Sequence, residues 1–306
     1  MTVSLTCTPA DGTAYTLTKC LRFSLLRERY QPFSVLRAEF AAESPDAPLP
    51  QHVTLKLDGQ TAHAGLIQRA DICKKDGMTV LTVFAKGDGV ALLRSQLDPG
   101  KYYSATLQSL LSAYTLPGVT YENVADTVNY INVDERQPLW EAVIAYAYKR
   151  SGGFPYVRVP NLVCVSPQTG QTAVTLPQNA VLARGNALDT ADVISRIDMA
   201  DLDGTYGSFT LTNAEAVRRG IVSVQNMRFD QQFLYAPPDA MQFRISRSSR
   251  RMLAQSVRYA GYCGEDIEDL IACGTLSGRV SRIHITGGPD GIITEDTLYT
   301  DDFCNT

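Results

Sequence analysis

The sequence predicts a β-rich α+β fold with two small antiparallel β-barrel-like domains, a small α/β insert and one long helix. Three observations support this prediction. Short runs of alternating apolar and polar residues fill both ends of the chain, and Gly, Asp or Pro separates most of them. Apolar residues at helical spacing are confined to a few segments. The 306 residues, 44% of them hydrophobic, suffice for two or three domains with buried cores.

The first domain is predicted to span residues 1–98 and to contain only strands. Its strand-like runs are AYTLTKCLRFSLLRE, SVLRAEFAA, HVTLKLDG, HAGLIQRADICKK and MTVLTVFAKG. The dipeptides Asp58-Gly59 and Asp76-Gly77 lie between such runs. Tight hairpin turns favour these dipeptides because their central residues adopt positive φ angles. We therefore expect a compact all-β unit.

The second domain, residues 99–166, is predicted to be a small mixed α/β unit. A first helix is expected between Tyr102 and Tyr114, where leucines recur at helical spacing, followed by the strand-like pair VTYENV and VNYINV. A second helix begins at Pro138, an acceptable first-turn residue, and ends before Gly152. The runs FPYVRV and LVCVS then form a hairpin.

The third domain is predicted to span residues 167–306 and to combine strands with one long helix. Strand-like runs resume in TAVTLP, AVLARG, DVISRIDMAD, GSFTLT and GIVSVQNMRF, and the chain closes with DIEDLIACG, RVSRIHITGG and GIITEDTLYT. Between these groups a helix is expected over residues 239–259, with Gly261 as its stop. The two β halves of the chain are candidates for distant copies of one another.

Composition and charge narrow the class of protein. The apolar fraction is too high, and the net charge of −4 too small, for a disordered chain. No stretch approaches the roughly 20 apolar residues of a membrane span, and nothing in MTVSLTCTPADGT resembles a signal peptide. A pI near 5.5 argues against binding nucleic acid or acidic membranes through bulk charge. We expect a soluble, folded, multidomain protein without membrane insertion.

The usual catalytic and metal-binding motifs are absent from the sequence. The seven cysteines include no Cys-x-x-Cys and are expected to be free thiols in a reducing cytoplasm; they are Cys7, Cys20, Cys73, Cys164, Cys263, Cys273 and Cys304. His52, His63 and His284 stand alone, and the latter two are expected to be solvent-facing or hydrogen-bonded. No nucleophile elbow, phosphate loop or dinucleotide motif occurs. The sequence predicts no catalytic residue, metal site or cofactor, and no enzyme.

Two acidic groups deserve separate consideration. Asp198, Asp201 and Asp203 precede Gly204, but a calcium loop aligned on this glycine has Met199 and Thr210 where oxygen ligands are required. A polar turn is the favoured interpretation. Pairs of carboxylates for glycoside hydrolysis are available from Glu135, Asp198 and Glu295, but the sequence favours no particular pair.

One constellation stands out from this background. Four arginines share one narrow stripe of the predicted long helix, because their spacing is i, i+3, i+7 and i+14; they are Arg244, Arg247, Arg251 and Arg258, with Arg250 beside them. One interpretation is a solvated basic face. The alternative is a docking surface for an acidic protein partner or for passing DNA, since the planar guanidinium pairs with carboxylates and phosphates.

The order of these features resembles the late control protein D family, the baseplate hub proteins of contractile phage tails and related particles. VTLKLDGQTAHAGLIQRADICKKDGMTVLTVFAKG is similar to the family's strand–turn–strand passage, with Gly65 and Ile67 in the characteristic place. INVDERQPLWEAVIAYAYKRSGGFPYVRVPNLVCVSP resembles its middle domain, in which a helix with an early tryptophan precedes a glycine and a hairpin. DGVALLRSQL and the segment closing with Tyr259-Ala-Gly-Tyr-Cys-Gly264 also have counterparts.

This resemblance implies a structural protein rather than an enzyme. A family member would form a homotrimeric ring, each chain giving two similar barrels, and would join the sixfold tail tube to the trimeric tail spike. Its partners would be its own copies, the spike, the tube and other baseplate proteins, with DNA only as cargo in the channel. It would be made in the bacterial host cytoplasm and act in the virion tail baseplate or a tail-like particle. The alternative is a β-rich protein that binds or cleaves cell-wall glycan.

Overall fold

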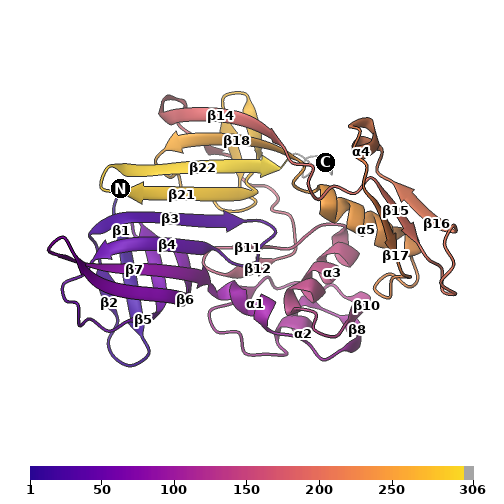
Figure 1. Ribbon diagram of the computed structural model, residues 1–306, viewed down its shortest axis with the longest axis horizontal. Helices are drawn as coiled ribbons and strands as arrows, with labels where there is room; N and C mark the ends of the chain where they lie inside the picture. Colours follow the sequence, from indigo (N-terminus) through magenta and orange to yellow (C-terminus); the bar gives the residue numbers. More distant parts are fainter. Residues whose placement is uncertain (300–306) are drawn as a thin grey trace.

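The computed structural model describes residues 1–299, and its largest element is an eleven-stranded antiparallel sheet (Figure 1). The strand order is β14-β18-β22-β21-β3-β4-β7-β6-β5-β1-β2. Strands from both ends of the chain therefore belong to one sheet. Their bounds are β1 (Val3–Pro9), β2 (Tyr15–Leu17), β3 (Cys20–Glu28), β4 (Val35–Ala41), β5 (Pro50–Leu57), β6 (Gln60–Lys75), β7 (Met78–Gly87), β14 (Val181–Leu188), β18 (Leu253–Ala260), β21 (Arg282–Gly288) and β22 (Gly291–Tyr299).

The first β unit, β1–β7, follows the alternation of its sequence. Phe23 and Leu25 of β3 point into the core, and Ser24 between them is partly exposed. The predicted hairpin turns are confirmed. Asp58 and Gly59 connect β5 to β6, Asp76-Gly77 connects β6 to β7, and all of these residues have positive φ angles.

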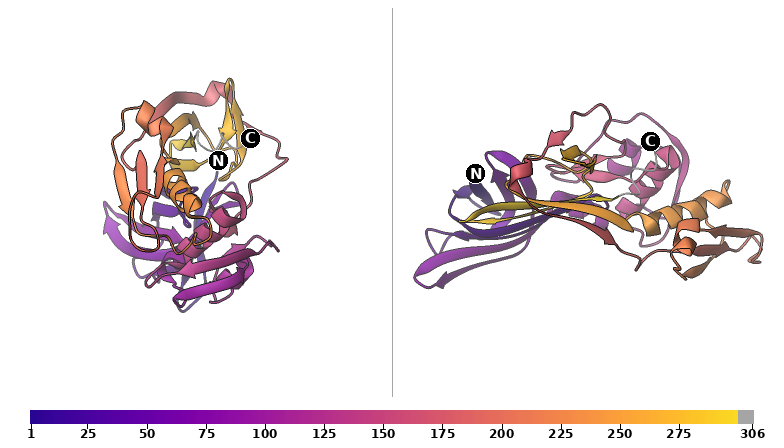
Figure 2. Two further views of the ribbon diagram at one scale, coloured as in Figure 1. Left: turned by 90° about the vertical axis from the view of Figure 1, so that its right-hand side faces the viewer. Right: turned by 90° about the horizontal axis from the view of Figure 1, so that it is seen from above.

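The second β unit repeats the strand order of the first. Its strands β14-β18-β22-β21 stand in the same order as β3-β4-β7-β6, and β21 pairs with β3 to continue the sheet. One hydrophobic core includes residues of both units. A small sheet of β13 (Val174–Thr175), β19 (Leu270–Cys273) and β20 (Leu276–Arg279) completes the second unit. The chain thus has the β-rich α+β fold predicted from the sequence, with the two β units joined in one curved sheet (Figure 2).

The middle module lies below the sheet in Figure 1, and its core is built around α3. Pro138 precedes α3, and Gly152 follows it with a φ of 72°, as predicted. Eight of the 13 residues of α3 are buried, because the helix is covered on several sides. The bounds in this module are η1 (Asp88–Val90), α1 (Ala91–Arg94), β8 (Gly100–Ala105), α2 (Leu107–Leu111), β9 (Thr120–Tyr121), β10 (Val128–Val133), α3 (Leu139–Ser151), β11 (Tyr156–Arg158) and β12 (Leu162–Cys164).

One local prediction for this module was wrong. The helix expected between Tyr102 and Tyr114 is only α2, because residues 100–105 form β8 and pair with β10. Thr106 caps α2 through the Ser109 N–H, which fixes where the helix begins. Of the two strand-like runs VTYENV and VNYINV, the first contains the short strand β9, which pairs with β12, and the second forms β10, which pairs with β8. The hairpin of β11 and β12 forms as expected.

A third module interrupts the second β unit between β14 and β18 and projects at the right of Figure 1. The module contains β15, β16, α4, β17 and α5, and the short helix η2 lies before it, just ahead of β14. Its core includes Ile197, Met199 and Met241. Phe243 of α5 packs on Tyr148 of α3 with ring centroids 4.8 Å apart, which joins this module to the middle one. The bounds are η2 (Gln178–Ala180), β15 (Arg196–Met199), β16 (Phe209–Thr212), α4 (Ala214–Arg218), β17 (Val224–Met227) and α5 (Pro237–Ser249).

The long helix predicted over residues 239–259 was wrong in its second half. The helix α5 ends at Ser249, and residues 253–260 form β18 between β14 and β22. Val257 and Tyr259 are buried with period two, which suits a central strand of the sheet better than a helix. Tertiary pairing on both sides of β18 thus overrides the helical spacing of the apolar residues. Among the helices of residues 1–299, none combines the length and apolar character needed to cross a membrane.

Candidate partner-docking surface

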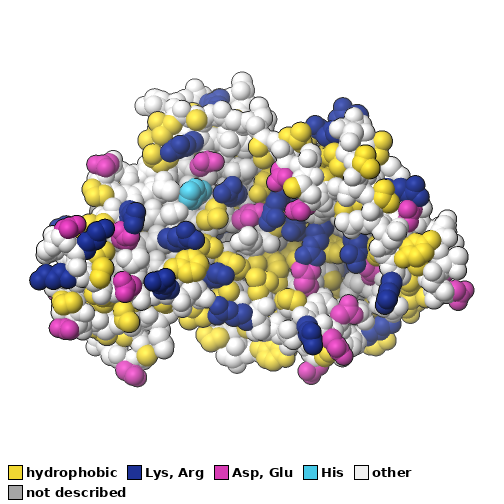
Figure 3. Space-filling model, in the orientation of Figure 1, with side chains coloured by type: hydrophobic (Ala, Val, Ile, Leu, Met, Phe, Trp, Pro, Cys, Tyr) yellow, Lys and Arg dark blue, Asp and Glu magenta, His cyan; other side chains and the backbone are white. Residues whose placement is uncertain are grey.

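The arginines of α5 line a groove of about 760 Å³ between the middle module and the third module. Figure 3 shows Lys and Arg side chains gathered along this hollow. Most of the arginines that line the groove come from α5 and the residues just after it, and Arg228 follows β17. The carboxylates that line it come from both modules and from the end of β14. Its charged lining residues are Asp134, Glu141, Asp189, Asp192, Arg228, Asp230, Arg244, Arg247, Arg250 and Arg251.

The two predicted docking residues on α5, Arg244 and Arg247, pair with carboxylates inside the chain. Arg247 donates two hydrogen bonds to Glu141 of α3, from Nη1 to Oε2 at 2.6 Å and from Nη2 to Oε1 at 2.7 Å. Glu141 raises the pKa of Arg247 through these bonds. Arg244 Nη2 lies 3.5 Å from Asp230 Oδ2. The Arg247 guanidinium therefore connects the middle module to the third module as well as lining the groove, whereas Arg244 pairs within the third module.

The next two arginines contact residues at the end of β3 and just after it. Arg251 Nη2 lies 2.5 Å from Glu28 Oε1, at the end of β3. Arg250 lies over the ring of Tyr30, with its Cζ 4.1 Å from the ring centroid. Burial lowers the pKa of Arg250 to about 10. The stacked Tyr299 ring lies on the Tyr30 ring, with centroids 5.9 Å apart.

Arg258 does not belong to this surface. It lies on β18, where it is exposed and stands opposite Glu295 of β22. The predicted stripe of four arginines depended on one continuous helix, and α5 ends before this position. The structure thus brings Arg244, Arg247 and Arg251 together and leaves Arg258 on the sheet.

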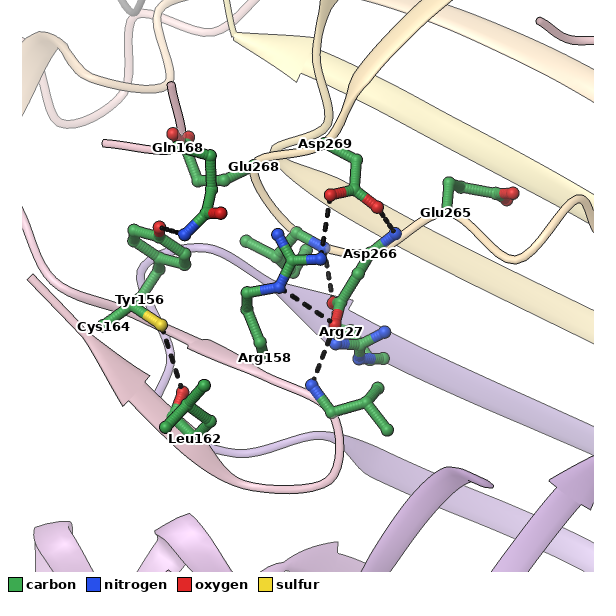
Figure 4. Close-up of polar contacts among 12 residues, drawn as sticks. Arg27, Tyr156, Arg158, Leu162, Cys164, Gln168, Glu265, Asp266, Glu268 and Asp269 are labelled. Carbon is green, nitrogen blue, oxygen red and sulfur yellow. Dashed lines mark hydrogen bonds and ion pairs between the residues drawn. The ribbon is translucent and has the colours of Figure 1, made fainter. Parts of the chain in front are cut away.

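A second polar cluster joins both β units to the middle module (Figure 4). Asp266, in the segment between β18 and β19, forms an ion pair with Arg27 of β3. The other Asp266 oxygen, Oδ2, accepts the backbone N–H of Val159 at 2.9 Å and lies 3.5 Å from Arg158 Nε. Arg158 also reaches Asp269, with 2.8 Å between Nη2 and Oδ1. The Asp266 carboxylate, which belongs to the second β unit, therefore contacts groups of the first β unit and of the middle module. The four charged side chains of the cluster are between 6% and 20% exposed.

A third cluster consists of carboxylic acids inside the second β unit. Asp296 of β22 is fully buried, and neither of its carboxyl oxygens has a hydrogen-bond partner among residues 1–299. Glu265 is also buried and accepts the Tyr259 hydroxyl at 2.5 Å through Oε1. Burial raises the pKa of both acids, and the charge of Glu265 raises the pKa of Asp296 further. Burial and a neighbouring carboxylate both disfavour the charged form of an acid.

The histidines named in the sequence are scattered and hydrogen-bonded. His63 is fully buried, with Nδ1 2.7 Å from Ser34 Oγ, and burial lowers its pKa to about 3. His284 Nε2 lies 2.9 Å from Ser24 Oγ. His52 Nε2 lies 3.1 Å from the Asp88 carboxylate. Within residues 1–299 no group of three His, Cys, Asp or Glu side chains is arranged to hold a metal ion.

The acidic residues weighed as ligands or catalysts form local contacts. Asp201 Oδ1 accepts the backbone N–H groups of Asp203 and Thr205, which makes the polar turn that the sequence favoured. Asp198 accepts the Thr210 hydroxyl at 2.7 Å and Arg196, and these bonds lower its pKa. The cysteines of the described residues are free thiols, as expected; Cys304 lies outside the described residues.

Comparison with known proteins supplies the fold relationship. No family model and no curated protein matches the chain. A prophage MuSo2 43 kDa tail protein from Shewanella oneidensis is similar over 99% of this chain and 98% of its own, with 13% identity and a TM-score of 0.69. The tail protein from Neisseria meningitidis MC58 covers 98% of this chain and 97% of its own, with 10% identity and a TM-score of 0.73.

A more distant similarity is to a component of the E. coli type VI secretion system, which is described as structurally similar to the T4 bacteriophage tail proteins gp27 and gp5. It covers 92% of this chain and 73% of its own, with 10% identity and a TM-score of 0.56. The similarity to the two tail proteins extends over nearly the whole of both chains. This chain therefore has the fold of those phage tail proteins.

Proposed function

We propose that this protein is a structural hub of a phage-tail baseplate or a tail-like particle. The observation that carries the proposal is the repeated strand order β3-β4-β7-β6 and β14-β18-β22-β21 within one chain whose fold is that of tail proteins. Three such chains in a ring present six similar β units. A ring of this kind matches a sixfold tail tube on one side and a trimeric spike on the other.

The role of the charged groups in this proposal is mechanical. The Asp266 cluster and the Arg247–Glu141 pair each connect parts of the chain that are distant in sequence. The Arg27–Asp266 pair is buried and holds a defined geometry, because separating its partners exposes an uncompensated charge. The Arg247–Glu141 pair is partly exposed, and its two parallel hydrogen bonds fix its geometry. We infer that they keep the β units and the two smaller modules in fixed relation while neighbouring proteins bind. No bond-breaking step is assigned to the protein.

The partners in this proposal are the protein's own copies, the tail spike, the tail tube and other baseplate proteins. DNA passes through the ring as cargo. The groove lined by Arg244, Arg247 and Arg251 is proposed as a docking site for an acidic segment of one of these proteins, because these three side chains remain 47%, 37% and 37% exposed. The protein is made in the host cytoplasm and acts in the assembled tail.

The test is the solution mass of the full chain, measured alone and with the spike protein encoded beside it. We expect a homotrimer, either alone or upon addition of the spike, and sixfold contacts with the tube in electron micrographs of the assembled particle. A chain that remains a monomer with its spike contradicts the proposal. Measurable peptidoglycan degradation by that monomer would instead favour a glycan-cleaving protein.

A further inference from the structure

We propose that neighbouring copies join edge to edge, with β14 of one copy pairing antiparallel with residues 69–74 of β6 in the next. This inference rests on the proposed ring and specifies its contact. The pairing repeats between copies the junction that β3 and β21 form inside each copy. Four observations support it: the equivalence of the two β units, two free strand edges, the register and the side chains that the register brings together.

The two β units are equivalent in detail and not only in strand order. In each unit a two-residue turn joins the last two strands, with Lys75 paired to Met78 in the first and Gly288 paired to Gly291 in the second. Lys75 therefore corresponds to Gly288, and the residues before Lys75 in β6 correspond one by one to the residues before Gly288 in β21. The internal junction uses β21, so the corresponding strand in the first unit is β6.

A shared irregularity fixes the equivalence of the other strand. The β3–β4 register shifts between Cys20 and Arg22, and the β14–β18 register shifts between Val181 and Ala183. Each shift lies at the start of the first strand of its unit, so the two bulges occupy the same place in the repeated pattern. A bulge marks one defined residue of a strand, and it can therefore be used to align the two strands. They make β14 the counterpart of β3, which is the other strand of the internal junction.

Both counterpart strands have an unpaired edge. Among residues 1–299, β14 pairs only with β18 and ends the eleven-stranded sheet. Strand β5 covers β6 only as far as Leu66, so residues 69–74 pair with β7 alone. Residues 182–188 of β14 are all exposed, whereas β3 alternates buried and open positions. A long exposed edge is a template for another strand, and Figure 1 shows the two edges at opposite sides of the sheet.

The register of the internal junction transfers without adjustment. There, Arg282 of β21 stands opposite Glu28 of β3. Their counterparts are Arg69 and Asp189, which the proposed pairing places opposite one another with the same signs of charge. Asp189 continues the β14 ladder, because its N–H donates to Met252 at 2.8 Å. Opposite charges across paired strands favour pairing.

The same register covers apolar surface. Leu188 is 55% exposed, and the register sets it opposite Ala70 of the next copy, beside Ile72. Ala70 and Ile72 are partly buried against the core and correspond to Ile283 and Ile285, which are buried in the internal junction. Pairing of β14 would bury these side chains in the same way. A second copy of this chain is therefore the occupant that fits the edge.

One pair in the register has like charges, Lys74 opposite Arg184. Arg184 turns back into its own β unit, where Nη2 donates to Cys273 Sγ at 3.1 Å. Lys74 is exposed and near the end of β6, so its ammonium group remains in water. The repulsion between them is accordingly small.

The contact is heterologous, since it joins two different strands. A heterologous contact gives a closed ring when its rotation is a simple fraction of a turn, and an open filament otherwise. Because the proposed contact repeats the internal one, the rotation from unit to unit is the same within and between copies. Three copies then enclose the channel with six junctions of one kind.

The experiment uses Cys73, a free and exposed thiol that the register places opposite Gly185. Facing residues in paired strands have Cα atoms about 4.5–5.5 Å apart, within the range that a disulfide bridges. The full-length variant Gly185→Cys is oxidised mildly and separated under non-reducing conditions. A Cβ at Gly185 meets only the flexible Ser256 hydroxyl, 3.2 Å away, so the variant is expected to fold.

The matched controls are Asn186→Cys and the double variant Cys73→Ser/Gly185→Cys. A shift of one residue turns the new thiol to the other face of the strand, so N186C is expected to cross-link poorly, and the double variant not at all. Native mass measured under reducing conditions shows whether each variant keeps the assembly state of the wild type. We expect cross-linked dimers and trimers from G185C only.

Two results overturn the inference. A trimer that G185C fails to cross-link, or that N186C cross-links equally well, shows that copies meet elsewhere, and leaves the proposed hub function intact. A chain that does not assemble at any concentration or with its spike refutes the edge pairing and the hub function together. Charge reversal gives an independent reading: Arg69→Asp and Asp189→Arg are each expected to weaken assembly at least tenfold, with recovery in the double variant.

Discussion

Arg247 of α5 and Glu141 of α3 form a two-point ion pair between residues that are 106 positions apart in the sequence. The pair joins the third module to the middle module beside the Phe243–Tyr148 ring contact. Both side chains are about one-third exposed, so water screens the attraction in part. The geometry nevertheless makes the contact specific, because a guanidinium matches a carboxylate through two parallel bonds.

Replacing Arg247 with Glu is therefore expected to affect stability as well as docking. The variant places two carboxylates side by side, and we expect the free energy of unfolding to fall by roughly 1–2 kcal/mol. Urea denaturation measures the loss. The reciprocal double variant Arg247→Glu/Glu141→Arg is expected to recover about half of it. If R247E unfolds like the wild type, the pair contributes nothing and the arginine serves docking alone.

Asp266 is predicted to be the most sensitive charged residue of the Figure 4 cluster. Asp266→Asn keeps the shape of the side chain but leaves Arg27, whose side chain is 6% exposed, without its carboxylate. Breaking a buried ion pair from one side costs about 3–5 kcal/mol. Thermal unfolding is the measurement.

Asp269→Asn is the matched control for this cluster. Asp269 contacts the outer guanidinium, Arg158, which also has Asp266 close by, and its Oδ2 accepts the backbone N–H of Asp266 at 2.8 Å. We expect D269N to lose less than half as much stability as D266N loses. Equal losses in the two variants would show that Asp266 is not the centre of the cluster.

Trp140 is predicted to be a core residue of the middle module. Its side chain is 2% exposed in α3, and its indole N–H has no hydrogen-bond partner among residues 1–299. Trp140→Ala is expected to destabilise the protein by about 3–5 kcal/mol. Trp140→Phe retains a ring and removes the unpaired N–H, so its loss in a denaturation experiment is expected to be clearly smaller. A W140A variant with unchanged stability would contradict the assignment.

The sequence predicted well those elements whose signals are local. The hairpin turns at Asp58-Gly59 and Asp76-Gly77 depend on backbone preferences of the residues themselves. The start and end of α3 follow from Pro138 and Gly152 in the same way. The β-rich fold class follows from alternation in most strands, which is also local.

Features that depend on distant partners could not be predicted. Residues 253–260 have apolar spacing that suits a helix, and only the neighbouring strands β14 and β22 make them a strand. The Asp266 cluster collects groups from β3, β11 and the segment after β18, with no spacing in the sequence to reveal it. The buried Asp296 gave a faint signal, since it interrupts the inward-facing series Ile292, Thr294 and Leu298. The domain boundaries at residues 98 and 166 remain predictions.

Gly65 is predicted to be required for the pairing of β6 with β7. A Cβ at this position would lie 2.2 Å from the backbone oxygen of Lys86, so the two strands would have to separate. We expect Gly65→Ala to lower the free energy of unfolding by about 1–3 kcal/mol. Gly153→Ala serves as the control, because its Cβ meets only the Ser151 hydroxyl at 3.3 Å. Comparable stabilities for the two variants would contradict the close approach at Gly65.

Asp296 is predicted to make stability fall as the pH rises. Its pKa is raised well above the ordinary value by burial and by the charges of Glu265 and Glu295. The folded state therefore keeps a proton that the unfolded state releases near pH 4. Below that pH the contribution to stability is complete, and it declines as the pH rises toward the raised pKa, by at most about 1.4 kcal/mol per pH unit.

Asp296→Asn imitates the protonated acid and removes this dependence. The free energy of unfolding is measured for both proteins by urea denaturation at several values between pH 5 and pH 8.5. We expect the stability of the variant relative to the wild type to increase steadily with pH, because only the wild type must retain a proton at position 296. Asp290→Asn, an exposed turn residue, controls for the loss of one carboxylate and is expected to parallel the wild type. Parallel curves for D296N and the wild type would show that Asp296 ionises in the folded protein as it does in the unfolded chain.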